Sequence, residues 1–248
     1  MRARDLLGNL ADITYGIILL ADSQPDSCWS QPGHSELLNV DSVKSIIDDL
    51  NDLNVVPVFA STEFVFDGSK GNYTEEDETN PILVYGRQKL EIESYLATCG
   101  MPHMTFRFAK IYGDEAGDGT IFVNWLQQLK AGVPAIRCAA DQAFSPVHVG
   151  DVAETIKRAI ESDLRGLYHL SGNRRFQRIE LLEMLIKKAR QFISVKTAVE
   201  PCSINDFDLP EDRPLDVSMC SDKISNDVGM QFADAEQICE QLARQEFP

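Results

Sequence analysis

Short apolar runs alternate with amphipathic helical patterns along the first half of the chain. Apolar runs within residues 13–21, 55–60 and 104–111 predict buried strands, because they are short, continuous and bounded by polar or turn residues. Apolar residues spaced three and four apart predict a helix over 40–53, and a second helix is expected over about 85–99. This alternation is typical of an α/β fold whose parallel sheet is covered by helices.

The second half of the chain follows a less regular pattern. The expected helices lie at residues 121–130, 149–162, 179–192 and 233–244. Short strands are expected at 133–138 and 167–171. The segment 195–217 is rich in Pro and Asp and has no apolar period, so it is expected to wrap the surface without regular structure.

Charge and composition narrow the possible partners. The 248 residues carry a formal net charge of −16, which repels phosphodiester backbones and excludes nucleic acid as an expected partner. No apolar run approaches the roughly 20 residues of a membrane span, and the N-terminus has no secretory pattern. The six cysteines and four histidines show no metal-ligand spacing. We therefore expect a soluble cytoplasmic protein with no membrane partner and no metal site.

The pair formed by Tyr85 and Lys89 is the first candidate for chemistry. Residues four apart project from the same face of a helix. A phenol with its ordinary pKa of about 10 is a poor acid at neutral pH, and a neighbouring ammonium is expected to lower that pKa. Such a pair can protonate a carbonyl oxygen as a hydride arrives. The same spacing also fits an ordinary solvated helix face.

Thr62 strengthens the chemical interpretation. The strand predicted at residues 55–60 is followed directly by Ser61 and Thr62. Ligands of open α/β sheets bind at the carboxyl ends of the strands, so a hydroxyl there can align a substrate carbonyl with the phenol. Thr62 could instead be a helix cap or turn residue.

Ordered motifs around these residues resemble the dTDP-4-dehydrorhamnose reductase group of the extended short-chain dehydrogenases/reductases. Residues 61–68 read STEFVFDG, similar to that family's STDYVFDG. Residues 80–91 read NPILVYGRQKLE and resemble its NPxxxYGxxKxxgE. Further similarity covers residues 107–113, the DQAFSP segment at 141–146, and Arg213-Pro214. So many landmarks in the same order make the resemblance specific.

The resemblance implies a Rossmann-like parallel sheet over residues 1–132 and a mixed C-terminal region over 133–248. That second region would combine a smaller substrate-binding lobe with elements that return to the sheet. The resemblance also implies NADPH or NADH as cofactor and a 4-keto nucleotide sugar as substrate. Thr62 would orient the substrate carbonyl, Tyr85 would donate the proton, and Lys89 would bind the nicotinamide ribose and tune Tyr85.

Further site residues follow from the same resemblance. Besides Tyr85 and Lys89, the residues expected along the cofactor are Ala21, Ala60, Phe108, Ala109 and Lys110. Besides Thr62 and Tyr85, the residues expected at the substrate are Glu63 and Arg213. Arg213 fits a salt bridge equally well. Gln142, Ser145 and His148 are expected to position the second lobe rather than to react.

The sequence departs from the family at its beginning. The family's GxxGxxG turn, whose amides cradle a pyrophosphate, does not occur before Tyr85. We therefore expect an N-terminally truncated Rossmann-like sheet that lacks roughly its first three strands. Residues 1–12 would form the helix that precedes the fourth. The strand within 13–21 would then be an apolar edge, covered by a homo-oligomer or a partner chain.

A second glycine-rich segment, residues 113–119, has the spacing GxxxGxG between a predicted strand and a predicted helix. Its three acidic residues would repel a diphosphate. We therefore expect a flexible loop there rather than a cofactor turn.

Two functions from different classes remain open. The first is a reductase of a 4-keto nucleotide sugar, impaired if the cofactor-binding turn is missing. The second is a non-catalytic nucleotide-sugar-binding or regulatory protein, since residues 168–173 also resemble the beta subunit of methionine adenosyltransferase. Epimerase or dehydratase activity fits less well, because those families have a different segment around the catalytic Ser or Thr. Glu63 and Phe64 replace the reductase family's Asp and Tyr and leave the substrate open.

Overall fold

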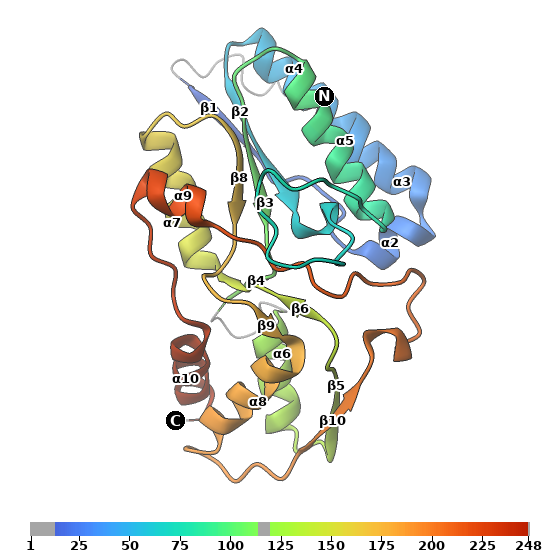
Figure 1. Cartoon of the computed structure of the whole chain (residues 1–248), viewed down its shortest axis with the longest axis vertical. Helices are drawn as coiled ribbons and strands as arrows, with labels where there is room; N and C mark the ends of the chain where they lie inside the picture. The colour runs from blue at the N-terminus through green and yellow to red at the C-terminus, as the bar shows by residue number, and fades with distance from the viewer. Residues whose placement is uncertain (1–12, 114–119, 248) are drawn as a thin grey trace.

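A four-stranded parallel sheet forms the upper part of the molecule (Figure 1). The computed structural model describes residues 13–113 and 120–247. The sheet has the order β1-β2-β3-β8 and consists of β1 (Tyr15–Ile18), β2 (Val56–Thr62), β3 (Met104–Phe108) and β8 (Gly166–Leu170). All neighbouring pairs are parallel. The α/β fold with a Rossmann-like parallel sheet is thus confirmed, and β1 is shorter than the predicted strand.

Helices cover the two faces of this sheet (Figure 1). On one face lie α4 (Ser42–Asp52) and α5 (Val84–Thr98), and on the other lie α7 (Val149–Glu161) and α9 (Asp222–Val228). Adjacent residues of β2 point to opposite faces, as the two-residue period of a strand requires. Phe59 packs in the core under α4 and α5, whereas Val58 packs in the core under α7 and α9.

The connection from β1 to α4 contains elements that the apolar pattern did not predict. They are α2 (Pro25–Ser30), α3 (Pro32–Glu36) and the π-helical turn η1 (Leu37–Asp41). Proline is favoured at the first position of a helix, which explains where α2 and α3 begin. Helices of five or six residues are too short to show a helical period.

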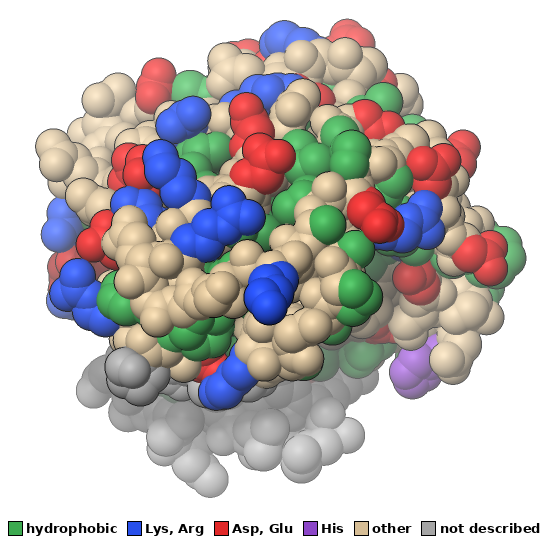
Figure 2. Space-filling view, turned by 90° about the horizontal axis from the view of Figure 1, so that it is seen from below, with side chains coloured by type: hydrophobic (Ala, Val, Ile, Leu, Met, Phe, Trp, Pro, Cys, Tyr) green, Lys and Arg blue, Asp and Glu red, His purple; other side chains and the backbone are tan. Residues whose placement is uncertain are grey.

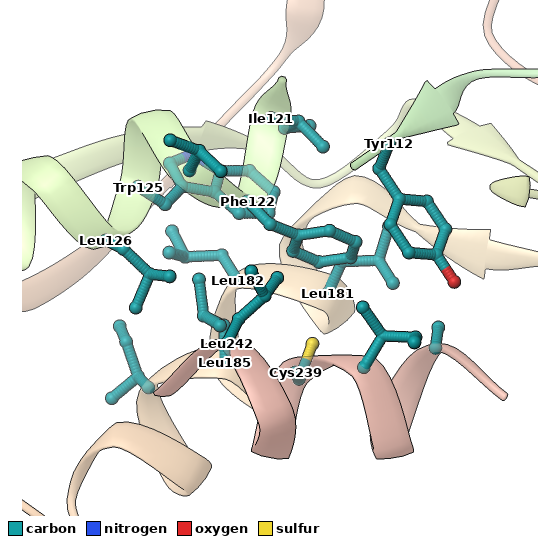
Figure 3. Packing of buried hydrophobic residues seen from close by; sticks show 14 of the residues in the cluster. Tyr112, Ile121, Phe122, Trp125, Leu126, Leu181, Leu182, Leu185, Cys239 and Leu242 are labelled. Carbon is teal, nitrogen blue, oxygen red and sulfur yellow. The ribbon is translucent and has the colours of Figure 1, made fainter. Parts of the chain in front are cut away.

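A second lobe lies below the sheet in Figure 1 and has its own core. It contains α6 (Ile121–Lys130), α8 (Arg178–Ala189), α10 (Ala235–Glu246) and a parallel pair of strands, β5 (Ala135–Ala139) and β10 (Ala198–Cys202). Figure 3 shows α6 contributing Phe122, α8 contributing Leu185 and α10 contributing Cys239 and Leu242 to this core. Because α6 packs here, the cores do not follow the expected division at residue 132.

Short elements join the two lobes. β4 (Ile111–Tyr112) pairs with β7 (Val147–His148), and β6 (Ala143–Phe144) pairs with β9 (Phe176–Gln177). Two 3₁₀ turns complete the fold, η2 (Glu63–Val65) and η3 (Ile204–Asp206).

Segment 195–217 was expected to lack regular structure, and this expectation was wrong in part because it contains β10 and η3. Most residues of β10 are only partly buried or exposed, so the strand leaves no apolar pattern for the sequence to reveal.

β1 is an outer strand of the sheet that the structure describes. Ile17, Leu19 and Leu20 in and after it are 49%, 67% and 41% exposed. A homo-oligomer or partner chain that covers them stays a prediction. The expectations for residues 1–12, and most of the loop expected at 113–119, lie outside the described residues. In the two described ranges, no helix combines the length and apolar composition needed to cross a bilayer.

Candidate functional site

The carboxyl ends of the parallel strands bring most of the predicted cofactor residues to one edge of the sheet. The register pairs Ala60 with Phe106 and Thr62 with Phe108, and β1 ends three residues before Ala21. Ala109 and Lys110 directly follow β3. This edge is where open α/β sheets bind their ligands. The assignment of these residues to a cofactor stays a prediction.

Thr62, Tyr85 and Lys89 meet at this edge. The Thr62 hydroxyl lies near the Tyr85 phenol and lowers the pKa of that phenol. The Lys89 ammonium lies 5.8 Å from the centroid of the Tyr85 ring. All three residues are buried, with exposed fractions of 6%, 8% and 3%. Thr62 also has the capping role considered above, because its oxygen accepts a hydrogen bond of 3.3 Å from the Phe64 amide.

The pKa of Tyr85 moves in the direction opposite to the one expected from Lys89. Burial raises the pKa of the phenol well above its usual range, and the nearby Cys28 acts in the same direction. The Thr62 hydroxyl lowers it by less. The physical reason is that the charged phenolate loses hydration in the protein interior. Tyr85 therefore carries its proton at neutral pH.

Lys89 is held by the backbone beside the phenol. Its ammonium donates a 2.7 Å hydrogen bond to the Ala60 carbonyl and lies 4.8 Å from the centroid of the Phe59 ring. Burial lowers the pKa of Lys89 to about 8. The side chain thus points to the sheet edge where Ala60 was expected to contact the cofactor.

Gly86 allows α5 to approach the turn that follows Thr62. A Cβ atom at Gly86 would lie 2.1 Å from the Phe64 carbonyl oxygen, a distance that no side chain can occupy. The Phe64 ring contacts the Tyr85 ring edge-on, with centroids 6.4 Å apart. The absence of a side chain at Gly86 therefore sets the distance between Tyr85 and the Thr62 turn.

Two polar contacts that the sequence did not reveal fix α5 at its first turns. The Glu211 carboxylate accepts a 2.9 Å hydrogen bond from the Val84 amide, where the helix dipole favours a negative charge. One turn later, Gln88 accepts a 2.8 Å hydrogen bond from the Asn39 amide. These partners lie far from α5 in sequence, so no local pattern marks them.

A buried ion pair anchors the residue before Thr62. Arg107 on β3 donates to both carboxylate oxygens of Glu93 on α5, with a shortest distance of 2.7 Å. The Ser61 hydroxyl donates to the same carboxylate. Arg107 also contacts His169 on β8 at 3.3 Å, and burial followed by repulsion from Arg107 lowers the pKa of that imidazole to about 3. β2, β3, β8 and α5 are therefore tied together beneath the site.

A cleft of about 510 Å³ opens beside these residues, between the sheet edge and the second lobe. Its lining includes Glu63, Phe64, Lys110, Gln142 and Arg178. Thr62, Tyr85 and Lys89 do not line this cleft, although Glu63 directly follows Thr62 and the Phe64 ring contacts the Tyr85 ring.

The expected substrate residues Glu63 and Arg213 take different positions. Glu63 is buried, and its carboxyl accepts a 3.2 Å hydrogen bond from the Lys110 amide. Burial raises the pKa of Glu63, with Lys110 opposing the shift. Arg213 lines the cleft but forms an ion pair with Asp26 on α2, the alternative considered for it. Arg178 was not predicted, because nothing local distinguishes it from a surface arginine.

Comparison with known proteins shows the family of this chain. The model of the RmlD substrate binding domain matches residues 17–246. The chain belongs to the RmlD substrate-binding domain family. One similar family member is dTDP-4-dehydrorhamnose reductase of Sinorhizobium fredii, 28% identical over 234 residues that cover 91% of this chain and 78% of the relative.

The beta subunit of methionine adenosyltransferase 2 from Bos taurus is also similar. It is 26% identical over 167 residues, which cover 65% of this chain and 50% of the relative. Among solved structures, dTDP-4-dehydrorhamnose reductase of Bacillus anthracis in complex with NADP superposes with a TM-score of 0.82 at 21% identity. That match covers 92% of this chain and 79% of the other. At this identity the likeness supports the RmlD-type fold alone.

Proposed function

We propose that the chain takes part in the NAD(P)H-dependent reduction of a 4-keto nucleotide sugar. The observation that carries the proposal is that Thr62, Tyr85 and the Lys89 ammonium lie together, buried, at the carboxyl edge of the sheet. A protonated phenol, a hydroxyl that fixes a carbonyl, and a cation are the groups that carbonyl reduction needs. The sequence similarity to a dTDP-4-dehydrorhamnose reductase supports the same class of substrate.

We assign each of the three residues a role in this reaction. Tyr85 donates its proton to the substrate oxygen, and Thr62 holds that oxygen in line with the phenol. Lys89 would bind the cofactor ribose in place of the Ala60 carbonyl and would stabilise negative charge that develops on Tyr85. A nicotinamide cofactor, when bound, supplies the hydride.

The cofactor proposed is NADPH or NADH, and the described residues fit its nicotinamide end. Ala21, Ala60, Phe108, Ala109 and Lys110 lie at the carboxyl ends of neighbouring strands, and Leu19 and Leu20 leave an open apolar surface after β1. The glycine-rich turn that cradles a pyrophosphate is not among these 248 residues.

A titration followed by turnover tests the proposal. NADPH and NADH are titrated separately into the purified chain by fluorescence, and cofactor oxidation is then followed with dTDP-4-dehydrorhamnose as the substrate. Tyr85→Phe is expected to lower kcat by about 10²-fold or more, the contribution of a positioned acid, and to leave cofactor affinity nearly intact, because the phenyl ring is kept. Equal turnover by the variant would rule out Tyr85 as the proton donor.

A second candidate is a non-catalytic nucleotide-sugar-binding or regulatory subunit, supported by the similarity to the methionine adenosyltransferase subunit. In that case the chain binds a nucleotide sugar without oxidising NAD(P)H.

We also propose a cytoplasmic protein whose β1 surface is covered by a homo-oligomer or a partner chain. Light scattering of Leu19→Asp against wild type tests this cover, since a smaller assembly is expected for the variant.

A further inference from the structure

The helix that carries Tyr85 and Lys89 begins without a cap of its own. The residue before it, Leu83, has an extended backbone and an apolar side chain that accepts no hydrogen bond from the first turn. The first amides of a helix have no acceptor within that helix, so they need one from elsewhere. For Val84, the first residue of α5, the acceptor is the Glu211 carboxylate, at 2.9 Å. A residue 127 positions away in the sequence therefore completes the start of this helix.

Glu211 belongs to a segment that also contributes to the cleft. Residues 207–213 form a strap that runs from η3 toward α2 and α5 (Figure 1). Phe207, Leu209 and Arg213 of the strap line the 510 Å³ cleft. The strap therefore contacts both the cleft and the first turn of α5.

The strap is also attached to α2, the second element beside Tyr85. Arg213 donates a 3.2 Å hydrogen bond to the Glu211 carbonyl and forms an ion pair with Asp26 on α2. The buried Cys28 of the same helix lies close enough to the Tyr85 phenol to raise the pKa of that phenol. The strap thus holds two elements that meet at Tyr85.

The Glu211 carboxylate is held in an unfavourable state. Its side chain is only 9% exposed, and its second oxygen, Oε2, is buried without a hydrogen-bond partner among the residues that the structure describes. Arg87 lies 3.6 Å from the first oxygen and is itself largely exposed. On the face seen in Figure 2, by contrast, acidic and basic side chains are interspersed at the surface. A buried oxygen without a donor opposes folding, so stability alone does not account for a glutamate here.

We propose that Glu211 is a positioning residue that sets the place of Tyr85 by capping α5 from the strap. The proposal rests on the proposed function and adds to it a residue outside the group of Thr62, Tyr85 and Lys89. Val84 directly precedes Tyr85, so a shift of the first turn moves the phenol relative to Thr62. A displacement of about 1 Å at a reacting group can lower a rate by about 10²-fold.

Amide hydrogen exchange tests the contact without any turnover. The Val84 amide is protected in the wild-type chain by its bond to Glu211. In Glu211→Ala its exchange, measured by NMR, should be about 10-fold faster, which corresponds to the loss of one hydrogen bond. Glu211→Gln keeps an acceptor oxygen and should retain most of the protection. Asp212→Ala changes the exposed neighbour on the strap and should exchange as wild type does.

Kinetics test the consequence for Tyr85. With dTDP-4-dehydrorhamnose and NADPH, Glu211→Ala should lower kcat by about 10- to 100-fold. KM should stay nearly unchanged, because Glu211 is not part of the cleft lining. Glu211→Gln should recover most of the lost kcat, and Asp212→Ala should match wild type. A merely structural role would lower the thermal midpoint without this separation of kcat from KM.

A second variant removes the same hydrogen bond from the other side. Proline has no amide hydrogen and is favoured at the first position of a helix, so α5 should still form in Val84→Pro. Its kcat should fall as in Glu211→Ala, and the double variant should fall no further. Should Glu211→Ala fail to fold in a thermal unfolding experiment, Val84→Pro still decides the matter.

Two results would overturn the proposal. One is Val84 amide exchange that is equal in wild type and Glu211→Ala, and the other is wild-type kcat in Val84→Pro. A wild-type chain without turnover would contradict the reductase function instead, and the Val84 exchange would still show whether Glu211 holds the helix. The failure of this proposal and the failure of the proposed function are therefore distinguishable.

Discussion

The buried pair of Glu93 and Arg107 gives the sharpest test of how the site is supported. Their side chains are 9% and 5% exposed and share several hydrogen bonds. Glu93→Leu leaves the Arg107 guanidinium buried without a counterion and removes the acceptor of Ser61. Breaking a buried pair in this way costs about 3–5 kcal/mol of the free energy of unfolding. For a chain of this size the midpoint should fall by roughly 6–20 °C.

Removing both charges should cost much less than removing one. Replacing a buried pair with apolar residues of similar volume is often close to neutral, because neither charge has to be desolvated. We therefore expect Glu93→Leu with Arg107→Met to recover at least about 2 kcal/mol relative to the sum of the single variants. Urea unfolding followed by circular dichroism measures the four free energies, provided that the slope with urea stays constant.

A surface ion pair between α4 and α5 provides the control, because its carboxylate lies on the same helix as Glu93. Lys44 and Glu91 form a 2.6 Å ion pair with side chains 31% and 51% exposed. Glu91→Leu should change the free energy of unfolding by about 1 kcal/mol or less. The reasoning is refuted if Glu93→Leu costs no more than Glu91→Leu, or if the Glu93 and Arg107 single variants simply add.

Two further variants probe the residues around Thr62. Burial raises the pKa of Glu63 above its ordinary value of 4.5. The protonated Glu63 carboxyl therefore contributes fully to the free energy of unfolding below pH 4.5, and this contribution is lost as the pH rises through the raised pKa. The Glu63→Gln side chain cannot titrate, so the free energy of unfolding of this variant should fall less between pH 5 and pH 8 than that of wild type. The control Glu78→Gln, at an exposed position, should behave as wild type does. Parallel curves for Glu63→Gln and wild type would contradict this assignment. Gly86→Ala places a Cβ against the Phe64 carbonyl and should cost about 1–3 kcal/mol in urea unfolding and lower turnover. Gly33→Ala, which meets no atom within 4 Å, should be close to neutral, and an equal loss in both variants would argue against the steric explanation.

Part of the site was readable from the chain because it depends on local spacing. The helix face shared by Tyr85 and Lys89 follows from their four-residue separation. The position of Thr62 at a strand end follows from the apolar run before it. The end of β1 was predicted too late and β10 was missed altogether, since outer strands bury few side chains and leave little periodic signal.

Other features depend on residues that meet only after folding. Arg178 joins Lys110 at the cleft, and Arg213 pairs with Asp26, through contacts between separate elements. Glu211 reaches the first turn of α5 in the same way. None of these partners lies at a fixed distance along the sequence. The sequence alone therefore did not distinguish a salt bridge from a substrate contact for Arg213.

The sequence by itself determined the α/β fold, its main helices and sheet strands, and the helix face that carries Tyr85 and Lys89. Periodicity and covalent spacing act locally, so these features are present in the chain before it folds. The tertiary structure alone decided the protonation of Tyr85, the pairing of Arg213 and the meeting of Lys110 with Arg178 at the cleft. Burial and long-range charge contacts determine those properties, and they exist only once the elements have packed together.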